Sequence, residues 1–504
     1  MCATWILAPF MRQCSSNFIL QCQFAKKISS GNVKPFQTVP GLKALPVIGV
    51  MHHFLPIVGS VGLHKNFFNM FDVLYEKYGP IVKIEGIFGR GPMVMFFKPE
   101  DYDKIYRAEE IPGPIRRGFQ ALEYYREVLR KETFDGIYGL TTAQGEKWRQ
   151  FRTKVNPALL KPKLVKLYAP GLESIAKDLV TRLNRLDSRS DTSQELETYI
   201  RKWSLESVGL VALGDRIGCL EDNLPNDHPA NSLMYCSKTI PDLSFQLEFL
   251  PSFWNKWNPW RLNKLMDLFD LQWDVSQMFI NEAKKRIINR QHEIPDEEQS
   301  ILEKLLAIDD KVAVMMANEM LFAGIDTVSY SAIGVLYHLA TNQLSQEKVR
   351  QEIREGISSR YLKASIKESL RLLPVLSANL RETSRDHIVG GYHIPKGVFA
   401  IAPNEYLSKL EQNYPKAKEF IPERWLVNKS DPLYYGNTNA MITLPFGFGV
   451  RSCIGRRIAE LELEILIKKL LEELSIEWTG PPINVITKVI NEFKKPYYFR
   501  FNKI

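Results

Sequence analysis

One cysteine of this chain lies in a setting that suits metal ligation. Cys453 stands in a short loop with glycines on both sides. Gly449 and Gly455 let the backbone turn sharply and approach a flat cofactor closely. Arg451 can pair with a cofactor carboxylate, and Phe446 can shield the sulfur from water. These residues predict that Cys453 is an iron ligand.

A helix is expected directly after this cysteine. Apolar residues recur at spacings of four, three and four, at Ile454, Ile458, Leu461 and Ile465. The sulfur is thereby placed at a helix N-terminus, where free N–H groups and the helix dipole favour the thiolate that ligates metal. A buried structural cysteine in a glycine-rich turn is the alternative.

The pattern Phe-x-x-Gly-x-Arg-x-Cys-x-Gly around Cys453 resembles the haem-binding loop of the cytochrome P-450 family. The resemblance covers residues 66–504 and implies a mainly α fold with small β-sheets, in a single large domain. It also implies haem b as the cofactor, with the Cys453 thiolate as axial ligand. Three segments look most like mitochondrial members from insects: 124–133, 145–156 and 362–372.

A long, charge-poor helix is expected over residues 309–342. At its centre, Ala323 and Gly324 leave room for a cofactor face and a bound diatomic molecule. Asp326 and Thr327 can join water in a proton relay, because an acid beside an alcohol can pass protons inward. This stretch resembles the family's Ala-Gly-x-Asp-Thr motif for oxygen activation. An ordinary crossing of helices through small residues is the alternative.

Three residues match family positions that bind the haem propionates. Trp148 and Arg152 are four residues apart, on one face of an expected helix. From spacing alone, a packed Trp beside a surface Arg explains them equally well. Arg381 falls where the family has another propionate-binding arginine.

An acid and two arginines predict a structural brace. Glu368 and Arg371 lie three residues apart on an expected helix, and Arg424 lies in an expected loop. The helical pair can bond, and Arg424 can complete a buried triad. This matches the family's Glu-x-x-Arg and Pro-Glu-Arg arrangement, which braces the haem-binding core. A solvated surface pair is the alternative.

Basic residues on the same helix predict a docking surface. Lys363 and Lys367 are four residues apart and share a helix face. In mitochondrial members of the family, lysines at matching positions dock an acidic ferredoxin, which an NADPH-dependent reductase supplies with electrons. Arg456 and Arg457 can extend this patch. A solvated helix face is the alternative.

The first forty residues contain no acid and mix Arg, Lys, Ser, Gln and apolar side chains. This composition predicts a mitochondrial transit peptide, placed at residues 1–36, before a monooxygenase domain at 37–504. The expected location is the matrix side of the inner membrane. Four basic residues of the leader contribute to the net charge of +9. The remaining excess is small, and no nucleic-acid partner is expected.

Three tryptophans, Trp254, Trp257 and Trp260, alternate with basic residues. Such side chains can rest on a lipid headgroup layer, which predicts peripheral contact with the inner membrane. Packing over a substrate channel is the alternative.

Local patterns place the other elements. A helix is expected over residues 66–78, a hairpin with strands at 81–85 and 93–97, and a further helix from Pro99. Residues 159–290 are expected to be helical with polar loops.

The resulting prediction is a haem-thiolate monooxygenase that inserts one atom of O₂ into a lipophilic substrate, with electrons from a mitochondrial ferredoxin. Residues 112–134 match a region that covers the substrate in the family. Phe322, Val375 and Leu376 are expected to line an apolar pocket, which suits a steroid or a xenobiotic. The connection at 354–360 is shorter than the family usually has, so a non-catalytic or degenerate haem-binding protein is the alternative. An isomerase or dehydratase of the same fold would not need the acid–alcohol pair.

Overall fold

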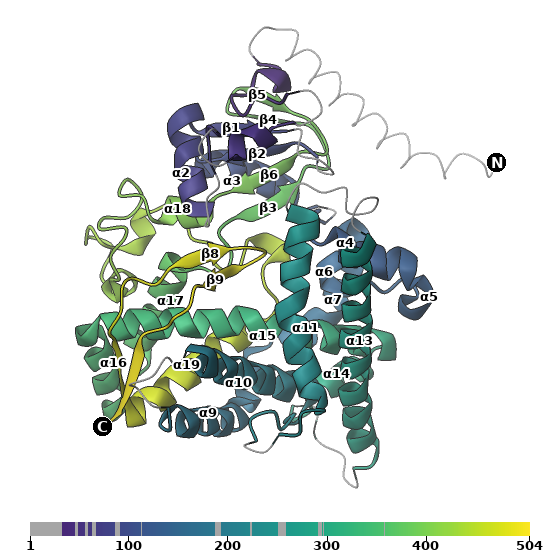
Figure 1. Cartoon of the computed structure of the whole chain (residues 1–504), viewed down its shortest axis with the longest axis vertical. Coiled ribbons are helices and arrows are strands. Elements are labelled where there is room, and N and C mark those ends of the chain that lie inside the picture. Colours follow the sequence, from purple (N-terminus) through teal and green to yellow (C-terminus); the bar gives the residue numbers. More distant parts are fainter. Residues whose placement is uncertain are drawn as a thin grey trace, which may run out of the picture.

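The computed structural model describes most of the chain, and helices dominate it (Figure 1). The predicted transit peptide lies almost entirely outside the described residues, as do Trp254 and Trp257. The described residues are 33–45, 49–55, 59–62, 67–85, 91–111, 113–186, 193–221, 224–249, 259–290, 295, 297–356 and 358–504.

The elements keep the labels of Figure 1. The α-helices are α2 (Phe67–Tyr78), α3 (Pro99–Ala108), α4 (Gln120–Tyr124), α5 (Lys131–Phe134), α6 (Gly139–Thr142), α7 (Gly145–Leu159), α8 (Pro162–Leu167), α9 (Ala169–Leu183), α10 (Ser193–Leu213), α11 (Pro229–Ser244), α13 (Pro259–Ile288), α14 (Ile301–Leu306), α15 (Asp310–Thr341), α16 (Gln343–Glu355), α17 (Arg360–Leu372), α18 (Asn404–Ser408) and α19 (Arg456–Glu473). The strands are β1 (Ile81–Ile84), β2 (Met93–Phe96), β3 (Asn379–Glu382), β4 (His387–Val389), β5 (Tyr392–Ile394), β6 (Phe399–Ala402), β7 (Leu474–Trp478), β8 (Val485–Thr487), β9 (Asn491–Phe493) and β10 (Phe499–Lys503). Short 3-10 helices are η1 (Phe36–Thr38), η2 (Met51–Phe54), η5 (Pro422–Trp425), η6 (Tyr435–Asn437) and η7 (Gly449–Arg451), and π-helical turns are η3 (Tyr125–Leu129) and η4 (Phe245–Phe249).

A four-stranded sheet in the order β1-β2-β6-β3 lies at one end of the molecule (Figure 1). Strands β1 and β2 form the predicted antiparallel hairpin, with Ile81 opposite Phe96. Strand β6 pairs parallel with β2 and antiparallel with β3. Helix α3 begins at Pro99, as predicted, because proline suits the first helical turn, where an N–H has no helical partner. The apolar faces of this sheet, α2 and α3 share one hydrophobic cluster.

The predicted long helix is α15, which runs through the middle of the helical part (Figure 1). Its N-cap is Asp309, whose carboxylate accepts from the backbone N–H groups of Lys311 and Val312. Among the described helices, α15 alone is long and apolar enough to cross a membrane, yet most of it is buried against its neighbours. It packs against α10, α13, α17 and α19. It is therefore the core helix of the fold.

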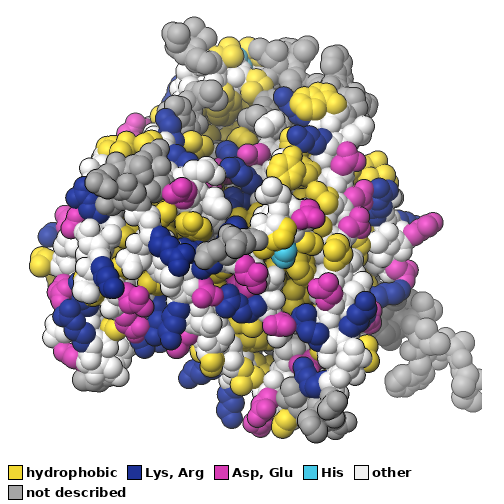
Figure 2. All heavy atoms as spheres, turned by 60° about the horizontal axis from the view of Figure 1, so that its bottom comes forward, with side chains coloured by type: hydrophobic (Ala, Val, Ile, Leu, Met, Phe, Trp, Pro, Cys, Tyr) yellow, Lys and Arg dark blue, Asp and Glu magenta, His cyan; other side chains and the backbone are white. Residues whose placement is uncertain are grey.

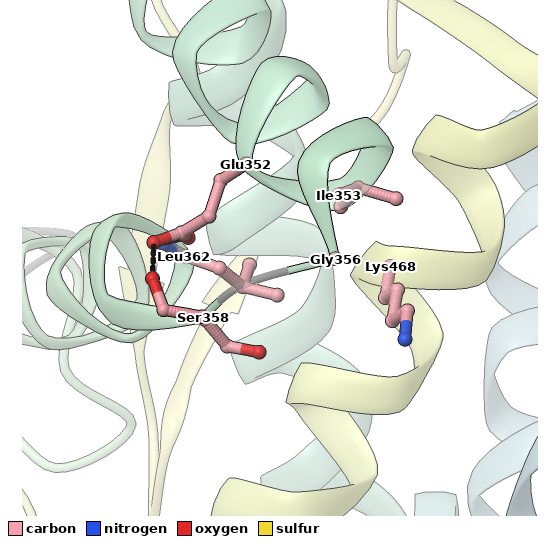
Figure 3. A pocket seen from close by; sticks show the side chains of 7 residues that line it. Glu352, Ile353, Gly356, Ser358, Leu362 and Lys468 are labelled. Carbon is pink, nitrogen blue, oxygen red and sulfur yellow. Dashed lines mark hydrogen bonds between the residues drawn. The ribbon is translucent and has the colours of Figure 1, made fainter.

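At the short connection between α16 and α17, hydrogen bonds satisfy polar groups at the adjoining ends of both helices (Figure 3). Gly356 ends α16 with a φ of +65°, which favours glycine. The Glu352 carboxylate accepts from the N–H groups of Tyr361 and Leu362 at 3.0 Å, and from the Ser358 hydroxyl at 2.7 Å. A cavity of about 240 Å³ lies beside the connection, between α16, α17 and α19. The end of α16 and the start of α17 are thus both capped, although the connection between them is shorter than the family usually has.

Candidate functional site

The Cys453 loop is a tight turn. The Cys453 N–H donates to the Phe446 carbonyl at 2.8 Å. Gly447 and Gly449 have φ values of +76° and +65°, in the left-handed region that favours glycine. A Cβ on Gly449 would also overlap the carboxylate of Glu110. The prediction that Gly449 lets the backbone turn sharply is confirmed.

The helix after the cysteine begins later than expected. Helix α19 starts at Arg456, with Gly455 as its N-cap residue. The φ of Gly455 is −82°, which any residue adopts, so the prediction of a sharp turn at Gly455 is wrong. A Cβ at this position would lie 3.9 Å from the Cys453 sulfur. Glycine here keeps the space beside the sulfur open.

The Cys453 side chain is exposed, yet protein surrounds it closely. Burial is the largest influence and raises the pKa of the thiol. The Gly455 N–H and the cations of Arg116, Arg152 and Arg456 act in the opposite direction. The sequence predicted that the helix N-terminus favours the thiolate. In the structure the effect of burial is larger, so the helix N-terminus alone does not keep Cys453 deprotonated. Because a metal cation stabilises a thiolate, ligation would reverse this balance.

Four guanidinium groups gather near this thiol, those of Arg116, Arg152, Arg381 and Arg451. Burial and repulsion from the other three lower the pKa of Arg451 to about 8. Burial and the neighbouring Arg381 lower the pKa of Arg116 to about 10. Burial also lowers the pKa of Arg152 and Arg381. Within the described part of the chain, no carboxylate lies within ion-pair distance of any of the four.

This arginine cluster has unused donors. Arg152 Nη2 donates to the Ser452 carbonyl at 3.0 Å, and Arg381 Nη2 donates to the Phe448 carbonyl at 3.0 Å. The Nε atoms of both arginines are buried without a partner. Buried, unpaired cations are costly unless an anion joins them. The two carboxylates of a haem fit this donor set.

Arg451 differs from the other three because four of its five N–H donors are already used. It donates to the carbonyls of Pro114, Leu140 and Ala143, and to the side chain of Gln144, at 2.8 to 3.1 Å. Its guanidinium also lies 4.2 Å from the ring centroid of Trp148. The structure thus gives Arg451 mainly a bracing position, with little left for the predicted cofactor carboxylate.

Trp148 and Arg152 both lie on α7 and are both buried, which excludes the surface-arginine alternative. The Arg152 guanidinium lies 5.9 Å from the Trp148 ring centroid. Phe446 is half-buried, and the Arg456 guanidinium lies 5.3 Å from its ring centroid. Phe446 therefore packs on the main hydrophobic core with part of its ring accessible.

Arg116 is a site residue that the sequence did not single out. It precedes α4, within the segment predicted to cover the substrate. Its backbone N–H donates to Gln144, which also binds Arg451. The richness of this segment in arginine was a signal, but only the fold brings Arg116 to Cys453.

The two small residues at the middle of α15, Ala323 and Gly324, lie in different surroundings. Ala323 and Thr327, one helical turn apart, are exposed on a helix that is otherwise largely buried. This leaves space beside them in the core. Gly324 was also predicted to leave room for the cofactor, and this is wrong. A Cβ on Gly324 would lie 2.6 Å from Val208 of α10, so the glycine permits close helix packing.

Asp326 has an incompletely paired carboxylate. Arg201 Nη2 of α10 lies 3.0 Å from Asp326 Oδ1, yet that oxygen is buried without a hydrogen bond. Burial raises the pKa of Asp326 to about 7, although Arg201 lowers it. Next to it, the Thr327 hydroxyl donates to the Ala323 carbonyl at 2.8 Å, which leaves its oxygen free to accept. Arg201 was not predicted.

The predicted brace forms. Glu368 accepts from Arg371 Nη2 at 2.7 Å and from Arg424 Nε at 3.0 Å, and all three side chains are fully buried. The Trp425 indole N–H is a further donor at 3.0 Å. The surface-pair alternative is excluded. The segment of Arg424, expected as a loop, is the 3-10 helix η5.

The predicted docking residues are exposed but partly paired. Lys363 is 58% exposed and lies 3.4 Å from Glu464, and Arg456 pairs with Glu460 at 3.0 Å. Lys367 lies 5.8 Å from the ring centroid of Trp425, and Arg457 is exposed. The structure leaves Lys363 and Lys367 exposed on α17, the helix that also carries Glu368 and Arg371 of the buried brace.

The fold and the thiol in its arginine cluster define a haem-binding class of protein. Residues 39–499 match the family model described as Cytochrome P-450. The chain belongs to this family. It is therefore an oxidoreductase of the haem-thiolate monooxygenase class, whose cofactor is haem b with a cysteine thiolate as axial ligand. This class uses O₂, a lipophilic substrate and a redox partner.

Relatives from insects resemble the chain over nearly its whole length. Cytochrome P-450 CYP12A2 of Musca domestica is 34% identical over 96% of this chain and 95% of the relative. Probable cytochrome P-450 12a5, mitochondrial, of Drosophila melanogaster is 34% identical over 94% and 91%. Probable cytochrome P-450 301a1, mitochondrial, of the same species is 30% identical over 94% and 88%.

Proposed function

We propose that Cys453 ligates the haem iron and that Arg116, Arg152 and Arg381 bind the haem propionates. The observation that carries this proposal is the buried cluster of guanidiniums without carboxylate partners beside an exposed thiol. Trp148 and Arg451 support the cluster from α7 and from the cysteine loop. Glu368, Arg371 and Arg424 brace the core around it.

Bound haem supplies the activation of O₂, from which one atom enters the substrate and the other leaves as water. Because burial raises the pKa of Asp326 to about 7, this carboxyl both gains and loses a proton near neutral pH. Thr327 presents its hydroxyl oxygen on the exposed face of α15, where it can accept that proton. The role of this pair is to deliver protons while the surrounding core excludes bulk water.

The substrate is a lipophilic molecule, either a steroid or a xenobiotic. Phe322 and Val375 are partly buried side chains packed on the main core, and Leu376 is 44% exposed. These apolar surfaces support a hydrophobic pocket. A binding-spectrum screen of steroids and insecticides on the purified protein tests this, and binding of polar compounds alone would contradict it.

The electron donor is a mitochondrial ferredoxin that its NADPH-dependent reductase reduces. Support comes from the exposed Lys363 and Lys367 on α17 and from Arg456 and Arg457, which begin α19 directly after the cysteine loop. Over the face in Figure 2, Lys and Arg side chains are interspersed with Asp and Glu, so this face has no broad field of one sign.

Charge reversal tests the docking surface. Lys363→Glu with Lys367→Glu should slow reduction by ferredoxin and leave haem binding intact. A matched control, Lys177→Glu with Lys285→Glu, changes two exposed helical lysines on α9 and α13. Equal reduction rates for both double variants would contradict ferredoxin docking at α17.

The protein is mitochondrial, on the matrix side of the inner membrane, after removal of a transit peptide at residues 1–36. The acid-free leader supports this, as do relatives whose names include "mitochondrial". Trp260 is 61% exposed, with the Arg261 guanidinium 4.8 Å from its ring centroid, which supports peripheral membrane contact. If the mature chain without detergent does not bind liposomes, the membrane contact is wrong.

Two measurements test the activity. The dithionite-reduced protein under carbon monoxide should show the red-shifted Soret band of a thiolate-ligated haem. Turnover with NADPH, ferredoxin reductase and ferredoxin should then give an oxygenated product. A normal Soret band without turnover of any lipophilic compound would favour the alternative, a non-catalytic haem-binding protein. The capped connection after α16 argues against a degenerate fold.

A further inference from the structure

A carboxylate from outside the cysteine loop contacts the backbone of that loop. Glu110 follows the C-terminus of α3 and is half-buried. Its Oε2 atom accepts from the Val450 N–H at 2.7 Å. This N–H belongs to the first turn of η7, where backbone donors have no partner within the helix. Glu110 therefore caps η7, which ends two residues before Cys453.

Other contacts hold the end of α3 against the same loop. The Arg107 guanidinium lies 5.2 Å from the ring centroid of Phe448, and the ring centroids of Tyr106 and Phe448 are 6.5 Å apart. A Cβ on Gly449 would lie only 2.2 to 2.4 Å from the carboxyl atoms of Glu110. The glycine thus permits the close approach of this carboxylate, and the packing of α3 fixes it in place.

The negative charge of Glu110 is not neutralised by an ion pair. Among the described residues, no cation lies within ion-pair distance of it, and Arg107 pairs with Asp103 at 2.8 Å instead. Burial lowers the pKa of Arg381, and the charge of Glu110 offsets part of that effect from a greater distance. Glu110 Oε1 is buried without a hydrogen bond. Because the proposed function assigns Arg381 to a haem propionate, the charge of Glu110 stays largely uncompensated in the holoprotein.

This charge lies close to the proposed iron ligand. Val450 is three residues before Cys453, so their backbones are at most about 11 Å apart. The loop between them is compact, since the Ser452 N–H donates to the Gly449 carbonyl at 3.0 Å. Solvent and salt screen a partly buried carboxylate less than an exposed one. Reduction of the iron adds one negative charge to the site, and a neighbouring carboxylate opposes that addition.

We propose that Glu110 is a positioning residue that lowers the reduction potential of the haem iron through the cysteine loop, an inference that rests on the proposed function of Cys453. The hydrogen bond to Val450 holds the carboxylate in place, and its charge favours the ferric over the ferrous state. In the first electron transfer, ferric iron gains one electron and the electron donor is oxidised by one. Glu110 restricts this step to donors of low potential.

Spectroelectrochemical titration of the purified holoprotein tests the proposal without substrate or turnover. Glu110→Gln keeps the size of the side chain and an oxygen that accepts from Val450, but it removes the charge. At the midpoint potential of the wild type, this variant should have a ferrous-to-ferric ratio at least about threefold higher, which corresponds to a rise of about 28 mV for one electron. Glu110→Asp keeps the charge and should shift the midpoint less than Glu110→Gln does.

Glu100→Gln is the matched control, because it removes one exposed carboxylate at the start of the same helix and should leave the midpoint unchanged. Equal midpoints for Glu110→Gln and Glu100→Gln would overturn the proposal. Glu110→Ala also removes the charge and should raise the midpoint. A rise in Glu110→Ala without a rise in Glu110→Gln would mean that the hydrogen bond alone sets the potential, and the role of the charge would be wrong.

The carbon monoxide spectrum of the same samples separates this proposal from the proposed function. A red-shifted Soret band in the wild type and in Glu110→Gln shows that the Cys453 thiolate binds the iron in both proteins. With that band present, equal midpoints overturn the role of Glu110 alone. A wild-type protein without the band would overturn ligation by Cys453, and this proposal with it.

Discussion

Two buried carboxylates of this fold, Glu368 and Asp326, both lie beside arginines but differ in how completely they are paired. Glu368 accepts hydrogen bonds from two guanidiniums, an indole and a backbone N–H. Asp326 Oδ1 has one guanidinium at 3.0 Å and no hydrogen bond. A fully satisfied carboxylate stays charged and fixes its surroundings, whereas a poorly satisfied one can gain and lose a proton. The first suits a brace, and the second suits a relay.

The largest expected effect comes from breaking the brace. Glu368→Gln removes the carboxylate that pairs with two fully buried arginines, Arg371 and Arg424. Loss of one partner of a buried ion pair costs about 3–5 kcal/mol. We expect little soluble holoprotein and a large fall in the free energy of unfolding, measured by urea titration. A change below about 1 kcal/mol would show that the triad is not a brace.

Asp326→Asn should act on chemistry instead of folding. The amide cannot donate the acid's proton, so turnover should fall about a hundredfold, the lower range for loss of a general acid. Haem content and the carbon monoxide spectrum should remain. Asp310→Asn, an exposed position at the start of the same helix, is the control. Full turnover by the Asp326→Asn variant would show that Asp326 does not deliver protons.

The same substitution should change the pH dependence of stability. The folded pKa of Asp326 is about 7, above its ordinary value of 3.8, so the folded state keeps a proton that the unfolded state has lost. Between about pH 4 and 7 the free energy of unfolding therefore falls as pH rises, by at most about 1.4 kcal/mol per unit. Asp326→Asn lacks this slope.

Urea unfolding of both proteins from pH 5 to 8 measures that difference. The stability of Asp326→Asn relative to the wild type should increase up to about pH 7 and then level off. A difference that does not vary with pH would mean that Asp326 has an ordinary pKa in the fold.

The smallest effect is expected at a surface pair. Glu464→Gln removes the partner of Lys363, which is 58% exposed. Because solvent screens such pairs, the free energy of unfolding should change by less than about 1 kcal/mol. Reduction by ferredoxin should be unchanged or faster, since Lys363 is released. Slower reduction would indicate that Glu464 orients Lys363 for docking.

Local patterns were sufficient for much of the fold and for part of the site. The hairpin of β1 and β2, the start of α3 and the extent of α15 follow from turn residues, a proline and apolar periodicity. The contacts of Glu368 with Arg371 and Arg424 were predicted from a short spacing and a family pattern.

Contacts between distant segments were not predictable in the same way. Arg201 meets Asp326 only because α10 packs on α15, and Arg116 meets Cys453 only through the fold. Gly324 was misread because its neighbour Val208 lies on another helix, so the sequence could not distinguish room for a cofactor from close helix packing.

The visible spectrum of Cys453→Ser tests the central claim most directly, that this thiol binds the haem iron. With Asp326→Asn as a folded control that keeps its thiol, the purified and reduced Cys453→Ser protein under carbon monoxide should lack the red-shifted Soret band and should not oxidise substrate. A folded Cys453→Ser protein with the wild-type band and wild-type turnover would contradict the account.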